Sequence, residues 1–270
     1  MSDAAPALAD LRGVWFRSLL VDAGGGRDTT TSVTWVQGPT RYADLRQPAG
    51  RPQPRGITGL ADLSASQLLD LTAQEAFAGR LRRLDDAYHW DRFFDFAPVA
   101  LPDSGRLHRQ GPALIEEGLH TPYVEHWHPA PESGPPHAAL DLTDPEDGRA
   151  GLLVRTGSWF CYVRDRAVPV PVGAPLADLV RGAADLSQAR LLVDLEVSLG
   201  RIATGRWTVR CSTLPHRVGA ELAPRLLPGE RLSIADTGPG GTPRTRVFAV
   251  TAGEGAVFAL TGHAWKGVHS

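Results

Sequence analysis

Cysteine and lysine are almost absent from this sequence. The two cysteines, Cys161 and Cys211, belong to no C-x-x-C pair, which excludes a disulfide-rich framework and a cysteine-based zinc site. Both lie in apolar stretches typical of strands, so we expect two buried, unreactive thiols. The single lysine is Lys266, and arginine therefore carries nearly all of the positive charge.

The chain also lacks a strong charge of one sign and a long hydrophobic run. Its net charge of −2 offers no overall attraction for nucleic acid or acidic lipid. No apolar run approaches the roughly 20 residues of a membrane span, and residues 1–10 lack the basic start of a signal peptide. We expect a cytoplasmic protein with no nucleic-acid and no membrane partner.

Sequence motifs of well-known catalytic and nucleotide sites are missing as well. The chain contains no Gly-x-Ser-x-Gly, His-Glu-x-x-His or kinase signature. The three glycines at 24–26 are followed neither by Gly-Lys-Ser/Thr nor by a helical pattern. They predict a hairpin loop, and no cofactor is predicted for this protein.

The first half of the chain contains short strand patterns separated by turn signals. They fall at residues 13–21, 31–37, 41–46, 77–84, 88–97, 106–108, 113–117 and 122–127. Prolines and glycines predict a loop over 47–59, and the capping box from Ser64 to Gln67 predicts a helix over 65–76, placed as a lid on a barrel mouth. Strands at about ten-residue spacing are typical of an all-β barrel or sandwich.

A stiff segment with four prolines, residues 129–136, divides the chain into predicted units at 11–130 and 137–265. After it the strand patterns resume at residues 138–142, 151–155, 159–164, 167–172, 190–200, 205–212, 231–234, 245–252 and 256–261. Helical patterns are expected at 176–184 and 218–226. The second unit is therefore predicted to be another β structure of similar size.

Five of the strands in the first unit place an aromatic residue two positions from a polar one. Side chains two apart on a strand share a face, so each set is expected on one face of the sheet. The sets are Trp15 with Arg17; Val33, Trp35 and Gln37; Tyr42, Asp44 and Arg46; Trp90, Arg92 and Phe94; and Tyr123, Glu125 and Trp127. Brought together, these faces predict an aromatic-walled chamber that contains buried charge.

These motifs also carry a resemblance. Gly13-Val14-Trp15, with Arg17 nearby, resembles the opening of the lipocalins and of the wider calycin superfamily. The ordered series that follows, together with Glu117-Gly118 and Arg206-Trp207, is similar to a fungal two-barrel lipocalin-like family of unassigned function. The resemblance implies a mainly β protein with two lipocalin-like antiparallel β-barrel units and a few short helices.

The favoured function is the binding of a small, largely apolar or aromatic molecule in the first barrel. The candidate ligand-binding residues are Trp15, Trp35, Gln37, Tyr42, Asp44, Arg46, Trp90, Arg92, Tyr123 and Trp127. In this hypothesis Arg46, Arg92 and Glu125 orient a polar group of the ligand. The competing interpretation is that the charges form structural ion pairs, such as Asp44 with Arg92, or that Arg17 stacks on a tryptophan.

Two other functions remain open. A cofactor-independent isomerase, cyclase, hydratase or lyase would use Glu125, Glu117 or His126 as its acid or base, with Glu117 and Glu125 as neighbours across a hairpin. A filled barrel with fully paired charges would instead favour a protein-interaction scaffold. His126 and His128 share a strand face opposite Glu125, but no third ligand is marked, so no metal site is predicted. The oligomeric state is left open.

Overall fold

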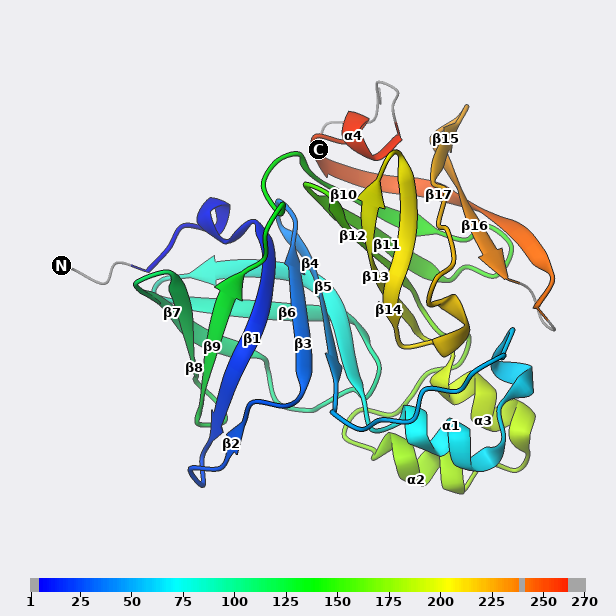
Figure 1. The fold of residues 1–270 in the computed structure, drawn as a ribbon, viewed down its shortest axis with the longest axis horizontal. Helices are drawn as coiled ribbons and strands as arrows, with labels where there is room; N and C mark the ends of the chain where they lie inside the picture. Colours follow the sequence, from blue (N-terminus) through cyan, green and yellow to red (C-terminus); the bar gives the residue numbers. More distant parts are fainter. Residues whose placement is uncertain (1–4, 238–240, 262–270) are drawn as a thin grey trace.

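The computed structural model describes residues 5–237 and 241–261, and the fold is mainly β, as predicted (Figure 1). Two antiparallel sheets lie side by side, and three helices gather beneath the second one in this view. Residues 262–265, the end of the second predicted unit, lie outside the described part.

The first sheet closes on itself as an eight-stranded barrel. Its strands are β1 (Gly13–Asp22), β3 (Ser32–Gln37), β4 (Arg41–Gln47), β5 (Glu75–Leu84), β6 (Ala87–Asp95), β7 (Ser104–Gln110), β8 (Ala113–Gly118) and β9 (Tyr123–Pro129), with the two-residue β2 (Arg27–Asp28) added beside β1. Pairing of β1 with β9 closes the barrel, and it includes Arg17 opposite Trp127. Each neighbour along the chain is therefore also a neighbour in space, the up-and-down order of small barrels.

The second sheet is curled but not closed in the same way. Its strands are β10 (His137–Thr143), β11 (Ala150–Thr156), β12 (Trp159–Arg164), β13 (Glu196–Ala203), β14 (Arg206–Ser212), β15 (Arg225–Leu227), β16 (Arg231–Thr237) and β17 (Pro243–Gly255). They lie in the order β14-β13-β12-β11-β10-β17-β16-β15. Leu222 lies between β14 and β16 and bonds to both. Its N–H donates to Trp207 O at 2.8 Å, and its carbonyl oxygen accepts from Ala235 N at 2.8 Å.

Four short helices complete the described fold: α1 (Ala65–Leu71), α2 (Leu176–Arg181), α3 (Leu186–Val193) and α4 (Phe258–Thr261). The capping box predicted for α1 is present, with Ser64 Oγ accepting from Gln67 N. The helix ends at Leu71 and not at 76, because Glu75 already pairs with Arg46 in β5. Among the described residues no helix is long and apolar enough to cross a membrane.

Three apolar clusters hold these layers together. One fills the first barrel and a second fills the concave side of the second sheet. The third joins the outer faces of both sheets to α1, α2 and α3; it includes Val36 of β3, Val163 of β12 and Val193 of α3. Because this shared core buries apolar surface from both sheets, it stabilises their association.

The two cysteines lie in or against this shared core as free thiols. Cys161 is buried and Cys211 is partly exposed. Burial raises the pKa of both thiols, that of Cys211 to about 11. Both groups are thus held in the weakly nucleophilic thiol form, in agreement with the expectation of unreactive cysteines.

Two strand predictions in the second half are wrong. One segment contains prolines, and the other begins inside a helix. Residues 167–172 form no strand, and Pro169 and Pro171 have no N–H to donate to a sheet. The run 190–200 begins as the last turn of α3, and β13 starts only at Glu196. A short apolar run does not by itself distinguish a buried helix from a buried strand.

Two further predictions near the C-terminal end also fail. Residues 218–226 contain no helix: Gly219 has a φ of +87°, which breaks helical geometry, and β15 begins at Arg225. Residues 256–261 contain α4 and not a strand.

Candidate functional site

A packed tryptophan cluster fills one part of the first barrel. The ring of Trp35 lies 6.1 Å from that of Trp15, 5.9 Å from Trp90 and 5.6 Å from Trp127, measured between centroids. Each of these four side chains is at most 6% exposed. Strand alternation brings the predicted aromatics together, but their rings pack against one another, so this part of the barrel is filled by side chains.

The Gly-x-Trp motif anchors this cluster. Trp15 Nε1 donates to Leu11 O at 2.7 Å, and the guanidinium of Arg109 lies 4.9 Å from the centroid of its ring. The cation on a tryptophan is therefore Arg109 and not Arg17 as considered from the sequence. Gly13 has a φ of +141°, a conformation that side chains with a Cβ rarely adopt.

Gln37 belongs to the packed part and not to a converging set of charges. Its Oε1 accepts from Trp35 Nε1 at 3.2 Å, and its Nε2 donates to Gly38 O at 3.1 Å. Gln37 is 1% exposed and is satisfied by these contacts. Its role as a ligand contact stays a prediction.

Beyond the aromatic cluster lies a network of buried ion pairs. Glu125 Oε1 accepts from Arg17 Nη1 at 2.6 Å and from Arg46 Nη1 at 3.3 Å, and it is 1% exposed. The two arginines also bind Asp28 at 2.8 Å and Asp44 at 3.0 Å. The predicted pair of Asp44 with Arg92 is wrong, because Asp44 binds Arg46, two residues along the same strand face.

A β-bulge in β6 sets the position of Arg92. Ala78 pairs with Phe94 while Gly79 pairs with Arg92, so Phe93 is the extra residue and is 57% exposed. A Cβ on Gly79 would collide with the carbonyl oxygen of Asp91, which makes glycine necessary at this close approach. As a result Phe94 packs between the sheets and does not share a face with Trp90, contrary to prediction.

Arg92 projects over the barrel interior and is held by two carboxylates. Its Nη1 donates to Asp95 at 3.1 Å and its Nη2 to Asp103 at 2.7 Å. Its guanidinium carbon lies 3.5 Å from the centroid of the Phe77 ring. Arg46 approaches the same ring at 5.1 Å, so both cations pack on one aromatic side chain.

The carboxyl partner of Glu125 across the β8–β9 hairpin is Glu116, which the sequence did not predict. Glu116 stands opposite Glu125 in the register, and Glu117 stands opposite Val124. Tyr123 Oη donates to one oxygen of Glu116 at 2.7 Å and Trp127 Nε1 to the other at 3.1 Å. Burial, reinforced by the charge of Glu125, raises the pKa of Glu116 well above its ordinary value.

Two of the three candidate acid or base groups lie outside the barrel. Glu117 is exposed on the outer face of the barrel. The prediction that it neighbours Glu125 is therefore wrong. His126 is half-buried on the same outer surface, and His128 beside it contacts Ser18 Oγ at 3.0 Å. In the described part of the chain, no group of three or more His, Cys, Asp or Glu side chains is arranged to hold a metal ion.

The barrel opens where β6 and β7 separate. These strands pair only from Tyr88 with Gly105 to His89 with Ser104, because the bulge directs the end of β6 toward the second sheet. A cavity of about 370 Å³ lies here, which we call the barrel mouth. Its lining includes Arg92, Val99, Leu101, Asp103, His120 and Tyr123.

Three buried polar atoms of the barrel have no hydrogen-bond partner within the described residues, and one of them belongs to Arg92 in the lining of the mouth. They are Tyr42 Oη, Arg92 Nε and Glu125 Oε2. Buried polar atoms of folded proteins are nearly always paired, with protein, water or ligand. One carboxylate, one guanidinium and one phenol therefore keep an unused donor or acceptor inside the barrel.

Asp44 gives this network a pH dependence. Burial raises its pKa to about 6, against the opposing effect of Arg46. In the unfolded chain the pKa of an aspartate is about 3.9. Protonation of Asp44 therefore stabilises the fold fully below about pH 4, and this stabilisation is lost as the pH rises through about 6. The shift corresponds to about 3 kcal/mol in the free energy of unfolding.

We expect Asp44→Asn, which keeps an oxygen for Arg46, to remove this pH dependence. The measurement is urea unfolding of both proteins from about pH 4 to about pH 7.5, taking the difference between their free energies of unfolding. The variant should gain stability relative to the wild type as the pH rises. A difference that stays constant over this range would contradict the assignment.

Comparisons with known proteins agree with the fold and name no activity. A similar solved structure is that of YLR301w, an uncharacterized protein from Saccharomyces cerevisiae, with a TM-score of 0.54 and 13% sequence identity. The match covers 90% of this chain and 98% of that chain, so both sheets are included. No protein-family description and no curated protein matches. A closed barrel beside a curled half-barrel is consistent with a calycin-like fold.

Proposed function

We propose that this chain is an intracellular binding protein for a small, largely apolar molecule held at the barrel mouth. The observation that supports this most is the unpartnered Nε of Arg92 in the lining of a cavity of about 370 Å³, with Tyr42 Oη and Glu125 Oε2 also unpartnered and buried in the same barrel. Small-molecule sites have volumes of roughly 300–1,000 Å³ and few polar groups in an apolar lining.

The charges around the mouth indicate the polar group of the ligand. Arg92 already binds Asp95 and Asp103, and Glu116 and Glu125 lie deeper in the barrel. Because carboxylates are in excess here, a negatively charged ligand is disfavoured. A neutral hydroxyl, carbonyl or amide fits better, since it can accept from Arg92 Nε.

The apolar part of the ligand would contact the loop that follows β6. Val99 and Leu101 line the mouth and are 55% and 58% exposed. Large apolar side chains grouped at a cavity rim are typical of a binding site. The packed tryptophans Trp15, Trp35, Trp90 and Trp127 then form the floor of the barrel, and of the predicted contacts Arg92 and Tyr123 line the mouth itself.

The neutral apolar dye Nile red tests this proposal. Its fluorescence should rise saturably with the wild-type protein, and Leu101→Asp should weaken binding about tenfold or more, since an apolar contact of that size is lost. The control is Leu84→Asp, at the last residue of β5, where Leu84 is 49% exposed and does not line the mouth. Equal dissociation constants for the two variants would refute binding at the mouth.

The enzymatic alternative is not favoured. Glu117 and His126 face away from the barrel interior, which leaves Glu125 alone among the predicted acid or base groups inside. Glu125 is committed to Arg17 and Arg46.

The same proposal extends to the family and the organisation of the chain. We propose that residues 11–130 and 137–265 are the two units of a lipocalin-like protein of the two-barrel type. The similarity to the yeast structure over 90% of this chain supports this, as does the switch from one sheet to the other between Pro129 and His137.

A further inference from the structure

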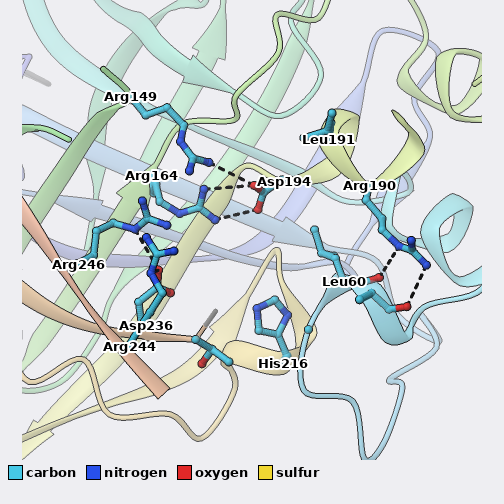
Figure 2. A pocket seen from close by; sticks show the side chains of 13 residues that line it. Leu60, Arg149, Arg164, Arg190, Leu191, Asp194, His216, Asp236, Arg244 and Arg246 are labelled. Carbon is cyan, nitrogen blue, oxygen red and sulfur yellow. Dashed lines mark hydrogen bonds and ion pairs between the residues drawn. The ribbon is translucent and has the colours of Figure 1, made fainter. Parts of the chain in front are cut away.

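A second cavity, of about 290 Å³, lies at the end of the curled half-barrel (Figure 2). It is enclosed by α3, by the 3₁₀ turn Leu60–Asp62 and by the ends of β16 and β17. Its lining includes the arginines Arg149, Arg164, Arg190, Arg244 and Arg246. We call this cavity the arginine cleft. Because its lining comes from segments far apart in the chain, no local sequence pattern predicts this cleft.

Three of these arginines are fixed by carboxylates. Arg149 and Arg164 converge on Asp194, at 3.3 Å and 2.8 Å. Arg246 binds Asp236 at 3.0 Å and Asp144 at 2.5 Å. Figure 2 shows the pairs with Asp194 on one side of the cleft. Such pairs hold their guanidinium groups in fixed positions, so donors that remain free point in defined directions.

The other two arginines have no carboxylate within hydrogen-bond distance among the described residues. Arg190 donates to the backbone carbonyls of Leu60 at 3.0 Å and Ala61 at 2.9 Å, which leaves its charge uncompensated. Arg244 Nε is 3.7 Å from Asp236, beyond hydrogen-bond distance, and its side chain is 36% exposed. These two cations lie at opposite sides of the cleft rim: Arg190 is on α3 and Arg244 is on β17.

A count of the charges gives a positive excess at this rim. The five arginines of the lining and Arg217 behind them make six positive charges. The carboxylates that contact them are Asp144, Asp147, Asp194, Glu196 and Asp236, which make five negative charges. The excess is therefore one positive charge, and it belongs to Arg190, which contacts no carboxylate among the described residues.

Two polar atoms of the lining residues lack a hydrogen-bond partner within the described part of the chain. Arg164 Nε lies 3.7 Å from Glu196 Oε2, so it belongs to the paired inner network. His216 Nδ1 is also unpartnered, and Figure 2 places its ring among the lining side chains. Burial lowers the pKa of His216, so the ring is neutral near pH 7 and can either donate or accept.

From this geometry we infer that the arginine cleft is a binding site for a small organic anion. Its oxyanion group contacts Arg244, whose carboxylate partner Asp236 lies beyond hydrogen-bond distance, and Arg190 adds an uncompensated positive charge at the other side of the rim. Planar guanidinium groups bind carboxylate and phosphate oxygens through paired hydrogen bonds. The carbon part of the anion lies against Leu60 and Leu191, the apolar residues of the lining.

The volume of about 290 Å³ limits the ligand to the size of a small metabolite. This site is separate from the barrel mouth, which belongs to the other sheet and carries an excess of carboxylates. An experiment that finds no binding at one of these sites therefore does not contradict binding at the other. Carboxylate and phosphate anions share the recognising chemistry, and the probes below distinguish them.

Calorimetric titration with inorganic phosphate and with citrate tests the inference, with sodium chloride keeping the ionic strength constant. We expect saturable binding of at least one probe to a single site. Binding of phosphate alone identifies a phosphoryl ligand, binding of citrate alone a carboxylate ligand, and binding of both a general oxyanion site. No saturable binding of either probe would overturn the inference.

The matched variants are Arg244→Gln and Arg210→Gln. Arg244 makes no hydrogen bond among the described residues, so its replacement should leave the fold intact while weakening anion binding about tenfold or more, the effect of one charge-assisted hydrogen bond. Arg210, exposed on β14 of the same sheet, lies outside the cleft and removes an equal charge. Equal losses in both variants would indicate surface electrostatics and overturn the site.

Discussion

Replacing Trp35 by alanine is expected to lower the free energy of unfolding by about 3–5 kcal/mol. Trp35 is 1% exposed, and its ring contacts three other tryptophans while its Nε1 donates to Gln37. The neighbouring rings come from separate strands and cannot close the space left by an indole. Urea unfolding monitored by circular dichroism measures the change.

Phe93→Ala is the control for this variant. Phe93 lies in the same barrel, but the bulge in β6 turns it outward and it is 57% exposed. We expect a loss of about 1 kcal/mol or less, as for other surface substitutions. If the two variants lose equal stability, the tryptophans do not form a packed cluster, and a ligand chamber among them becomes the better description.

Replacing Glu125 by alanine is expected to cost about 3 kcal/mol of unfolding free energy. Glu125 is 1% exposed and accepts from both Arg17 and Arg46. Its removal leaves two buried guanidinium groups short of negative charge. Arg17 keeps its ion pair with Asp28, and Arg46 keeps its ion pair with Asp44. The expected loss is therefore at the lower end of the range for a broken buried ion pair.

The control here is Asp86→Ala, which breaks an ion pair with Arg106 on the barrel surface. Those two side chains are 67% and 54% exposed and their attraction is screened by water, so a much smaller loss than for Glu125→Ala is expected. Glu125→Gln adds a second comparison, because it keeps an acceptor oxygen and should lose less than the alanine variant. Equal stability of Glu125→Ala and Asp86→Ala would contradict a buried ion network.

Strand alternation alone predicted most of the first barrel. Trp35 and Gln37, and likewise Tyr42 and Asp44, share the inner face because the two-residue period of a strand is fixed by backbone geometry. The capping box at Ser64 fixed the start of α1 for a similar local reason. Features that depend on neighbouring residues are thus readable from the sequence.

Features that depend on register were not readable. The bulge at Phe93 shifts the alternation of β6 by one residue, so Phe94 joins the core between the sheets. In the β8–β9 hairpin a shift of the register by one residue decides whether Glu116 or Glu117 stands opposite Glu125. Neither the bulge nor the hairpin register has a marker in the local sequence, apart from Gly79 opposite the bulge.

The arginine cleft and the barrel mouth depend on still longer distances. Arg190 meets the carbonyl of Leu60, 130 residues earlier in the chain, only because α3 packs against the turn after the proline-rich loop. The mouth requires β6 and β7 to diverge, which follows from the bulge. Sequence patterns of strands and helices contain no information on such meetings between distant segments.

Native mass spectrometry of the freshly purified protein, with the denatured mass as reference, tests ligand binding at the barrel mouth most directly. A tightly bound guest would add mass to the folded protein, and this excess would disappear on denaturation and in Leu101→Asp, but would persist in Leu84→Asp. The excess mass would also begin to identify the ligand. A bare mass for the folded wild type, or an excess that Leu101→Asp retains in full, would contradict a carrier that holds its ligand at this mouth.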